Sequence, residues 1–153
     1  MSDILSRMIA TFFCIGFAPK APGTAGTIAA LPLYCTLRRL SLPGYLFSIA
    51  LLTVLGTIAS DRMEVQWGKD PSQVVIDEVV GLLITLVSRP KSWRNILIGV
   101  IVFRLFDIIK PPPVGYIDNH VSGGVGIMAD DVAAGVLSAC CMALIGRNRV
   151  FRT

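Results

Sequence analysis

Long stretches without a single charged residue dominate this chain. One of them runs from Leu40 to Ser60 and approaches the roughly 20 residues that an α-helix needs to cross a bilayer. Only 16% of the 153 residues are Asp, Glu, Lys or Arg, and 54% are hydrophobic. Soluble domains contain about 25% charged residues. The sequence therefore predicts a membrane-embedded protein, and its length suits one domain covering residues 1–153.

Prolines divide the apolar sequence into helical segments, because proline starts and stops helices. The pattern predicts an all-α fold, namely a compact polytopic membrane bundle with about four to five short helical segments. A short apolar stretch at 4–17 precedes them. The expected segments are 24–37, 43–60, 73–88, 94–109 and 130–146.

The basic residues do not indicate a nucleic-acid partner. The net charge is +4, but Lys and Arg accumulate in the short loops of membrane proteins as topology signals and as contacts for lipid head groups. No aromatic residues alternate with the basic ones, as they would in a nucleic-acid-binding surface. We therefore expect membrane lipids as partners and no nucleic acid, and nothing in the sequence indicates an oligomer.

The few acidic residues gather where the expected helices begin or end. In an up-and-down bundle, the starts of the third and fifth segments and the end of the fourth lie on one membrane face, as does the loop before the first. Ionisable residues at a membrane span mark functional sites by default. The carboxylates expected on this face are Asp77, Glu78, Asp107, Asp130 and Asp131.

Two of these helix starts carry adjacent carboxylates, Asp77-Glu78 and Asp130-Asp131. A single acid at a helix start can act as a cap or pair with a nearby Arg or Lys. Neighbouring ionised carboxylates repel each other, so a hard divalent cation with oxygen ligands is a natural partner for a pair. The two pairs therefore suggest one shared cation site.

The segment from Gly16 to Thr27 is rich in small residues and leads directly into a helix. Backbone N–H groups at a helix N-terminus attract anions, and Lys20 and Thr24 can add donors, so the segment could cradle a phosphate. A tight turn with a helix cap and close packing at Gly26 explains the same pattern. The spacing alone favours neither interpretation.

A third segment, FRLFDIIKPPP at 103–113, spaces Arg104, Asp107 and Lys110 three residues apart. A structural ladder of ion pairs is one interpretation. In the other, Asp107 is a metal ligand and Lys110 contacts phosphate. His120 is the only histidine, so no triad or metal cluster based on histidines can form, and we interpret it as a polar loop residue.

Four blocks together resemble the phosphatidylglycerophosphatase A family. They are PGTAGT at 22–27, VIDEVVG at 75–81, FRLFDIIKPPP at 103–113, and a glycine-rich block from Asp118 to Gly135. The resemblance covers residues 16–135 and implies a phosphoric monoester hydrolase of the bacterial inner membrane. The implied reaction is the Mg²⁺-dependent removal of the terminal phosphate from phosphatidylglycerophosphate, which gives phosphatidylglycerol. Family members often carry a His at the position of Ser122, so the resemblance implies no role for His120.

This resemblance and the residue chemistry together define an expected site. The expected catalytic residues are Asp77, Glu78, Asp107, Lys110 and Asp131. One or two Mg²⁺ ions would be bound by Asp77, Glu78, Asp107, Asp130 and Asp131. The substrate phosphate would be bound by Lys20, Pro22, Gly23, Thr24, Gly26, Arg104 and Lys110. Attack by an activated water is the expected chemistry, and an aspartyl-phosphate at Asp107 or Asp131 is the alternative.

A small ion-coupled transporter or channel subunit is the rival function, because carboxylates within a membrane suit it equally well. The gathering of the acids on one rim argues against it. The sidedness of that rim is ambiguous. Five basic residues lie on the rim, whereas eight lie opposite it: Arg38, Arg39, Arg89, Lys91, Arg94, Arg147, Arg149 and Arg152. This excess of basic residues suggests that the face opposite the acidic rim is cytoplasmic. A substrate made in the cytoplasm suggests instead that the rim itself is cytoplasmic. We expect the site to be on the cytoplasmic face.

Overall fold

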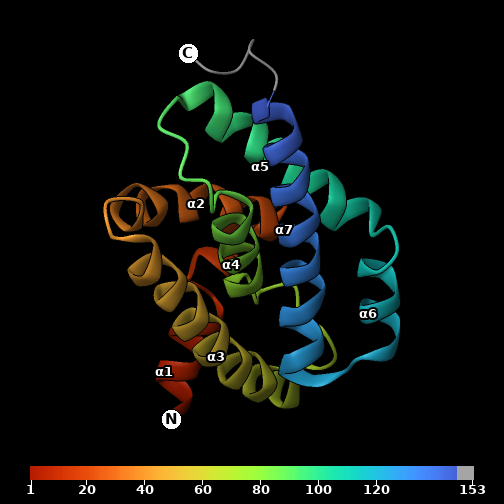
Figure 1. The fold of residues 1–153 in the computed structure, drawn as a ribbon. Coiled ribbons are helices and arrows are strands. Elements are labelled where there is room, and N and C mark those ends of the chain that lie inside the picture. The colour runs from red at the N-terminus through yellow and green to blue at the C-terminus, as the bar shows by residue number, and fades with distance from the viewer. Residues whose placement is uncertain (148–153) are drawn as a thin grey trace.

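Helices are the only regular secondary structure in residues 1–147, the part of the chain that this computed structural model describes (Figure 1). The all-α prediction is therefore confirmed. Seven α-helices and one short 3₁₀-helix follow one another in this order: α1 (Asp3–Ala10), η1 (Ile15–Phe17), α2 (Pro22–Leu37), α3 (Leu42–Trp67), α4 (Ile76–Thr85), α5 (Trp93–Ile109), α6 (Val114–His120) and α7 (Gly123–Arg147).

The starts and stops of the helices follow local chemistry that the sequence displays. Pro22 stands at the first turn of α2, where a missing N–H costs nothing. The Ser41 side chain caps α3 by accepting a hydrogen bond from the Gly44 N–H. At the other end of α3, Gly68 takes a positive φ of 95° and terminates the helix.

Helix number and length differ from the expectation of four to five short segments. Helix α3 has 26 residues and continues past residue 60, because its charged last turns are solvated and charge alone does not stop a helix. Helix α6 occupies a stretch that we expected to be loop. Helix α7 begins at Gly123 rather than at 130. Asp130 and Asp131 therefore lie about two turns inside α7 instead of at its start.

The glycines near residue 124 form helix instead of the expected loop because α7 packs closely on α3. A Cβ atom added at Gly124 would lie 2.1 Å from the Thr57 carbonyl oxygen. No side chain fits at this contact, so the glycine serves interhelical packing. The sequence shows a glycine cluster, but only the neighbouring helix explains why the backbone there is helical.

Helix α4 is the buried centre of the fold. It lies in the angle between α3 and α7, which meet at the bottom of Figure 1 and diverge above. The contact between α4 and α7 depends on two glycines. A Cβ at Gly81 would lie 2.9 Å from the Asp131 carbonyl oxygen of α7, and a Cβ at Gly135 would lie 2.6 Å from the Gly81 carbonyl oxygen. This approach positions the N-terminus of α4 against the first half of α7.

Two helices, α3 and α7, are long and apolar enough to cross a membrane. Only 22% of the most apolar 18-residue window of α3 is buried, whereas the core helix of a soluble protein is mostly buried. Large apolar side chains are exposed along α3, namely Leu42, Leu46, Phe47, Leu51, Val54 and Ile58. Helices α2, α4 and α5 have 16, 10 and 17 residues, fewer than the roughly 20 that span a bilayer unaided.

Substitution of the glycines between α4 and α7 should destabilise the fold. We expect Gly81→Ala and Gly135→Ala each to lower the free energy of unfolding by about 1–3 kcal/mol, since an added methyl group overpacks the contact. Gly146→Ala in α7 is the matched control, because no atom lies within 4 Å of its added Cβ. Thermal unfolding in detergent micelles measures the effect. Equal stability of the three variants would contradict the role of this contact.

Candidate active site

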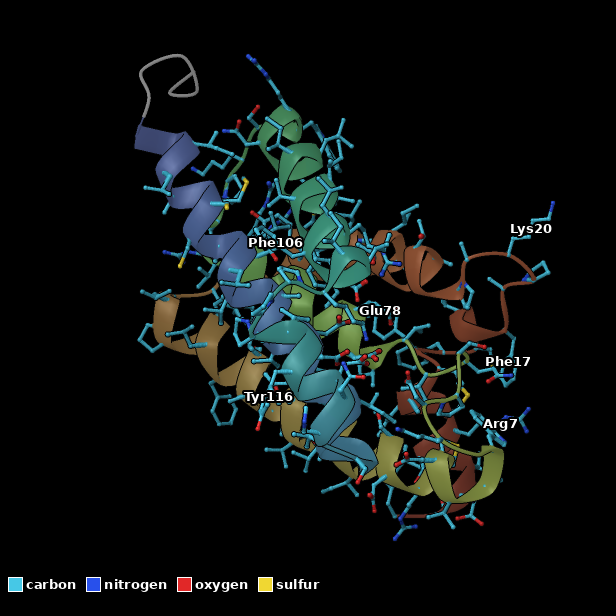
Figure 2. All side chains as sticks on the ribbon, turned by 90° about the vertical axis from the view of Figure 1, so that its right-hand side faces the viewer. Arg7, Phe17, Lys20, Glu78, Phe106 and Tyr116 are labelled. Atoms are coloured by element: carbon cyan, nitrogen blue, oxygen red, sulfur yellow. The ribbon has the colours of Figure 1, made fainter. Side chains whose placement is uncertain are left out.

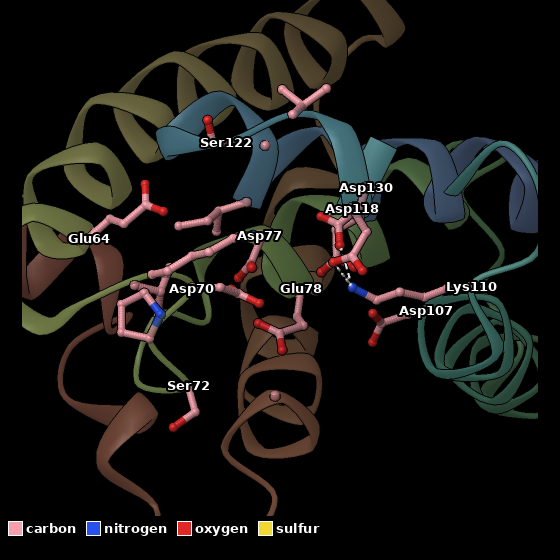
Figure 3. A pocket seen from close by; sticks show the side chains of 18 of the residues that line it. Glu64, Asp70, Ser72, Asp77, Glu78, Asp107, Lys110, Asp118, Ser122 and Asp130 are labelled. Atoms are coloured by element: carbon pink, nitrogen blue, oxygen red, sulfur yellow. Dashed lines mark hydrogen bonds and ion pairs between the residues drawn. The ribbon is translucent and has the colours of Figure 1, made fainter. Parts of the chain in front are cut away.

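A cavity of about 490 Å³ opens where α2 and α4 begin, α5 ends and α6 passes the first half of α7. Eight carboxylate side chains line it, against three cationic ones. The five carboxylates that the sequence predicted at one rim all belong to this lining. Figure 3 shows most of them converging on the same space. The structure thus brings together residues from three helices that are far apart in the sequence.

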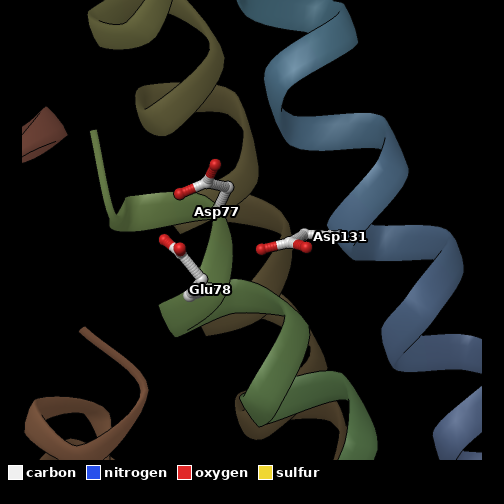
Figure 4. A group of neighbouring side chains, drawn as sticks. All are labelled: Asp77, Glu78 and Asp131. Atoms are coloured by element: carbon white, nitrogen blue, oxygen red, sulfur yellow. The ribbon is translucent and has the colours of Figure 1, made fainter. Parts of the chain in front are cut away.

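Three of these carboxylates form a cluster that could hold a metal ion (Figure 4). Asp77 and Glu78 lie in the first turn of α4, and Asp131 reaches them from α7. One oxygen from each carboxylate lies within 4.8 Å of the others. Such a spacing can close around one hard cation with oxygen ligands. The structure therefore brings one member of the second acidic pair, Asp131, next to both members of the first.

Two carboxylate oxygens of this cluster have no partner among the described residues. Asp77 Oδ1 and Glu78 Oε2 are buried and find no hydrogen-bond partner within residues 1–147. An ionised oxygen that is buried without a partner is costly. Burial raises the pKa of Asp77 well above its usual range, and the neighbouring Glu78 and Asp131 raise it further. Burial also raises the pKa of Glu78. The residues present therefore fit a bound divalent cation.

Arg104 provides a cationic group beside this cluster. Its Nη1 atom lies 2.6 Å from Asp107 Oδ2 and 3.7 Å from Glu78 Oε1. Its Nε atom is buried and has no hydrogen-bond partner within the described chain. Gly23, at the start of α2, makes room for the pair, because a Cβ there would lie 2.0 Å from Glu78 Oε1. An anion at this position would find a donor that the protein itself leaves unused.

Lys110 has a different environment. It ends α5 and bonds both Asp118 of α6 and Asp130 of α7, the latter at 2.8 Å. Burial lowers its pKa, but the two carboxylates outweigh this and raise the pKa above its usual range. Asp118 opens the fourth block of the resemblance, but the expected site gave it no role. Lys110 therefore connects three helices.

The expected phosphate-binding residues of the first segment are divided by the structure. Pro22 and Gly23 line the cavity, whereas Thr24 and Gly26 lie further along α2. A Cβ at Gly26 would lie 2.7 Å from the Val75 Cβ, so this glycine allows close packing. Lys20 is exposed and points away from Glu78 (Figure 2). The lining also includes Glu64 and Asp70, which no sequence motif had marked.

The cluster should bind a divalent cation in competition with protons. Because the pKa values of Asp77 and Glu78 are raised, protons occupy these oxygens at low pH. We therefore expect the apparent affinity for Mg²⁺ or Mn²⁺, measured by isothermal titration calorimetry, to rise with pH and then level off once both groups ionise.

Removal of one cluster oxygen should weaken this affinity. Since an outer partner of a metal ligand is already worth about 10- to 100-fold in affinity, we expect Asp131→Asn to cost at least as much. Asp3→Asn, which changes an exposed carboxylate far from the cavity, should leave the affinity unchanged. Equal binding by both variants would show that the cations bind elsewhere.

Comparison with known proteins supports the resemblance found in the sequence. The sequence model of the phosphatidylglycerophosphatase A family matches residues 8–146. No solved structure matches this chain. The position of the match includes all four sequence blocks and every residue of the acidic cluster.

Three relatives match along most of their lengths. An Escherichia coli protein named phosphatidylglycerophosphatase A is 34% identical over 144 residues, which cover 93% of this chain and 84% of the relative. A Haemophilus influenzae protein of the same name is 39% identical over 135 residues, covering 85% and 82%. A Bacteroides thetaiotaomicron protein provisionally named a phosphatidylinositol-3-phosphatase is 41% identical over 150 residues, covering 93% and 94%. The chain belongs to the phosphatidylglycerophosphatase A family.

Proposed function

We propose that this protein is a membrane lipid phosphatase that converts phosphatidylglycerophosphate into phosphatidylglycerol and phosphate, with Mg²⁺ as its cofactor. One observation carries the proposal. This chain belongs to the family, and its buried Asp77 and Glu78 each have a carboxylate oxygen without a hydrogen-bond partner. Beside them, the Nε donor of Arg104 is also unused. The two relatives named phosphatidylglycerophosphatase A support the substrate. We also propose that residues 1–153 form one membrane-embedded domain.

The donor set suits Mg²⁺, which prefers carboxylate oxygens and water. Asp77, Glu78 and Asp131 would hold the ion, with Asp107 and Asp130 adjacent. A bound divalent cation neutralises a phosphomonoester and makes water a better nucleophile. The two remaining carboxylates are already engaged, Asp107 by Arg104 and Asp130 by Lys110.

Arg104 is the side chain best placed to bind the phosphoryl oxygens, because its buried Nε has no other partner. Gly23 leaves the space next to it, and the first turn of α2 after Pro22 adds backbone N–H donors. Lys110 positions Asp130 and thereby the neighbouring Asp131. We propose that Thr24 and Gly26 maintain the start of α2, and that the exposed Lys20 contacts the lipid head group at the rim of the cavity.

Hydrolysis requires a water oxygen to attack phosphorus while the bond from phosphorus to the glycerol oxygen breaks. The attacking water gives up a proton and the glycerol oxygen gains one. Asp77 Oδ1 and Glu78 Oε2 are the acceptor atoms available to hold that water. We favour this route over an aspartyl-phosphate at Asp107 or Asp131, because Asp107 is paired with Arg104 at 2.6 Å and Asp131 belongs to the cluster that would hold the ion.

We place the protein in the bacterial inner membrane, with α3 and α7 crossing it and the cavity at the cytoplasmic face. The exposed apolar side chains of α3 support the membrane location. A substrate that is made in the cytoplasm supports the cytoplasmic face. Of the eight basic residues expected opposite the acids, Arg149 and Arg152 lie outside the described residues.

Phosphate release from purified protein in mixed micelles tests the function. We expect phosphatidylglycerophosphate to be hydrolysed with Mg²⁺, the activity to disappear in excess EDTA, and Mg²⁺ to restore it. Glu78→Gln should lower kcat by about 100-fold or more, as expected for loss of an essential carboxylate, whereas Asp3→Asn should not change it. Full activity in EDTA would exclude the metal-dependent scheme.

Two further measurements distinguish this function from a different lipid substrate and from ion transport. Phosphatidylinositol 3-phosphate should be a poorer substrate than phosphatidylglycerophosphate, and the reverse preference would assign the activity suggested by the Bacteroides relative's name. Ion flux in proteoliposomes without any phosphate release would favour a carboxylate-lined transporter instead.

Cysteine accessibility tests the sidedness. In a cysteine-free background, we expect Lys20→Cys to react with a membrane-impermeant maleimide from the cytoplasmic side and Arg39→Cys to react from the other side. Both positions are exposed, so access to reagent depends only on the membrane. The opposite labelling pattern would place the cavity at the outer face.

A further inference from the structure

A second polar cavity lies at the end of the molecule opposite the acidic site. It has a volume of about 390 Å³ and is lined by four cationic residues, Arg38, Arg39, Arg89 and Lys91. We call it the basic pocket. Arg38 and Arg39 follow α2, and Arg89 and Lys91 belong to the loop from α4 to α5. Both segments lie on the left-hand side of Figure 1.

The basic pocket is well separated from the acidic cavity. Helices α2 and α4 each begin at the acidic cavity and end near the basic pocket. With 16 and 10 residues, these helices are ~24 and ~15 Å long at 1.5 Å per residue. A phosphate bound in one cavity cannot contact the other.

No acidic residue neutralises the basic pocket. The sequence contains no Asp or Glu between residues 4 and 60 or between residues 79 and 106. Within residues 1–147, ion pairs are formed by Arg62, Arg104 and Lys110, and none involves the four residues of the pocket. Four like charges that line one cavity repel each other unless an anion joins them.

The two half-buried arginines are held in place by backbone carbonyl groups. Arg89 Nη1 donates to the Leu40 carbonyl oxygen at 2.8 Å, and Arg38 Nη1 donates to the Pro90 carbonyl oxygen at 3.4 Å. The loop after α2 therefore holds Arg89, and the loop after α4 holds Arg38. A guanidinium has five N–H donors, so both arginines keep donors for an anion. Arg39 and Lys91 are exposed at the edge.

The surroundings of the pocket resemble a membrane interface. Leu40, Leu42 and Trp93 are large, exposed and close in sequence to the cationic residues. Leu42 also starts α3, one of the two helices long enough to cross a bilayer. Tryptophan is enriched where the bilayer meets water, and basic pockets at that level bind lipid head groups.

We propose that the basic pocket binds the phosphate head group of an anionic phospholipid, at a site separate from the one that holds the substrate phosphate. Unneutralised charge, preoriented arginines and adjacent exposed apolar side chains together favour a lipid over a free anion. The phosphate would lie between the two loops, and the acyl chains would lie along the exposed side chains beside Trp93.

Quenching of Trp93 fluorescence tests this directly. The only other tryptophan, Trp67, lies at the far end of α3, and a Trp93→Phe variant measures its contribution. In neutral detergent micelles with EDTA, brominated phosphatidylglycerol should quench the fluorescence of Trp93 more strongly than brominated phosphatidylcholine does at the same mole fraction. EDTA removes cations that could attract the lipid phosphate to the acidic cavity.

Two double variants distinguish charge from folding. Arg39→Gln with Lys91→Gln removes two charges that form no hydrogen bond within the described residues, so the fold should persist. The apparent affinity for the brominated anionic lipid should fall at least tenfold. Arg39→Lys with Lys91→Arg keeps both charges and should restore it. Arg62→Gln, which removes a charge beside Asp3 instead, is the matched control and should bind as the unchanged protein does.

Three outcomes would overturn the proposal. Excess quenching by the anionic lipid that persists in the double Gln variant would place the lipid elsewhere. An equal loss in Arg62→Gln would reveal a general effect of net charge. Complete displacement of the brominated lipid by inorganic phosphate at the same concentration would assign the pocket to free phosphate. These readouts involve no catalysis, so they are independent of the proposed activity.

Discussion

The close approach of α4 and α7 is the contact on which the rest of the structure depends. Gly81 and Gly135 remove the side chains that would keep these helices apart. As a result, the first turn of α4 lies beside the first half of α7, and Asp77 and Glu78 meet Asp131. A helix pair held further apart by side chains would separate these carboxylates. The same contact that fills the core thus creates the acidic cluster.

Assembling this cluster is electrostatically costly, and the structure shows how the cost is distributed. Arg104 compensates Asp107, and Lys110 compensates Asp118 and Asp130. Glu78 has one long ion pair, at 3.7 Å from Arg104, and Asp77 and Asp131 form none within the described chain. A site that leaves its most buried carboxylates uncompensated is suited to a cation from solution. The basic pocket at the other end of α2 and α4 has the opposite charge, because four cationic residues and no acidic residue line it.

Local chemistry explains much of what could be predicted. Pro22, Ser41 and Gly68 mark helix ends by mechanisms confined to a few neighbouring residues. The apolar stretches predict helices, and the four motifs predict the family. The start of α7 was missed because its glycines resemble a flexible loop when α3 is not known to lie against Gly124. Helix α6 was missed because it is short and follows three prolines.

The sequence by itself determined the all-α class, the scarcity of charge that favours a membrane, and the five carboxylates that line the cavity. These properties follow from residue type and from spacing along the chain. Only the tertiary structure decided which Lys and Arg side chains reach that cavity. Lys20 follows a turn that directs it outward, and Asp118 engages Lys110 across a proline-rich bend. The Nε donor of Arg104 is left without a partner. Spacing along the chain does not predict this, because the partners of a side chain depend on three-dimensional packing.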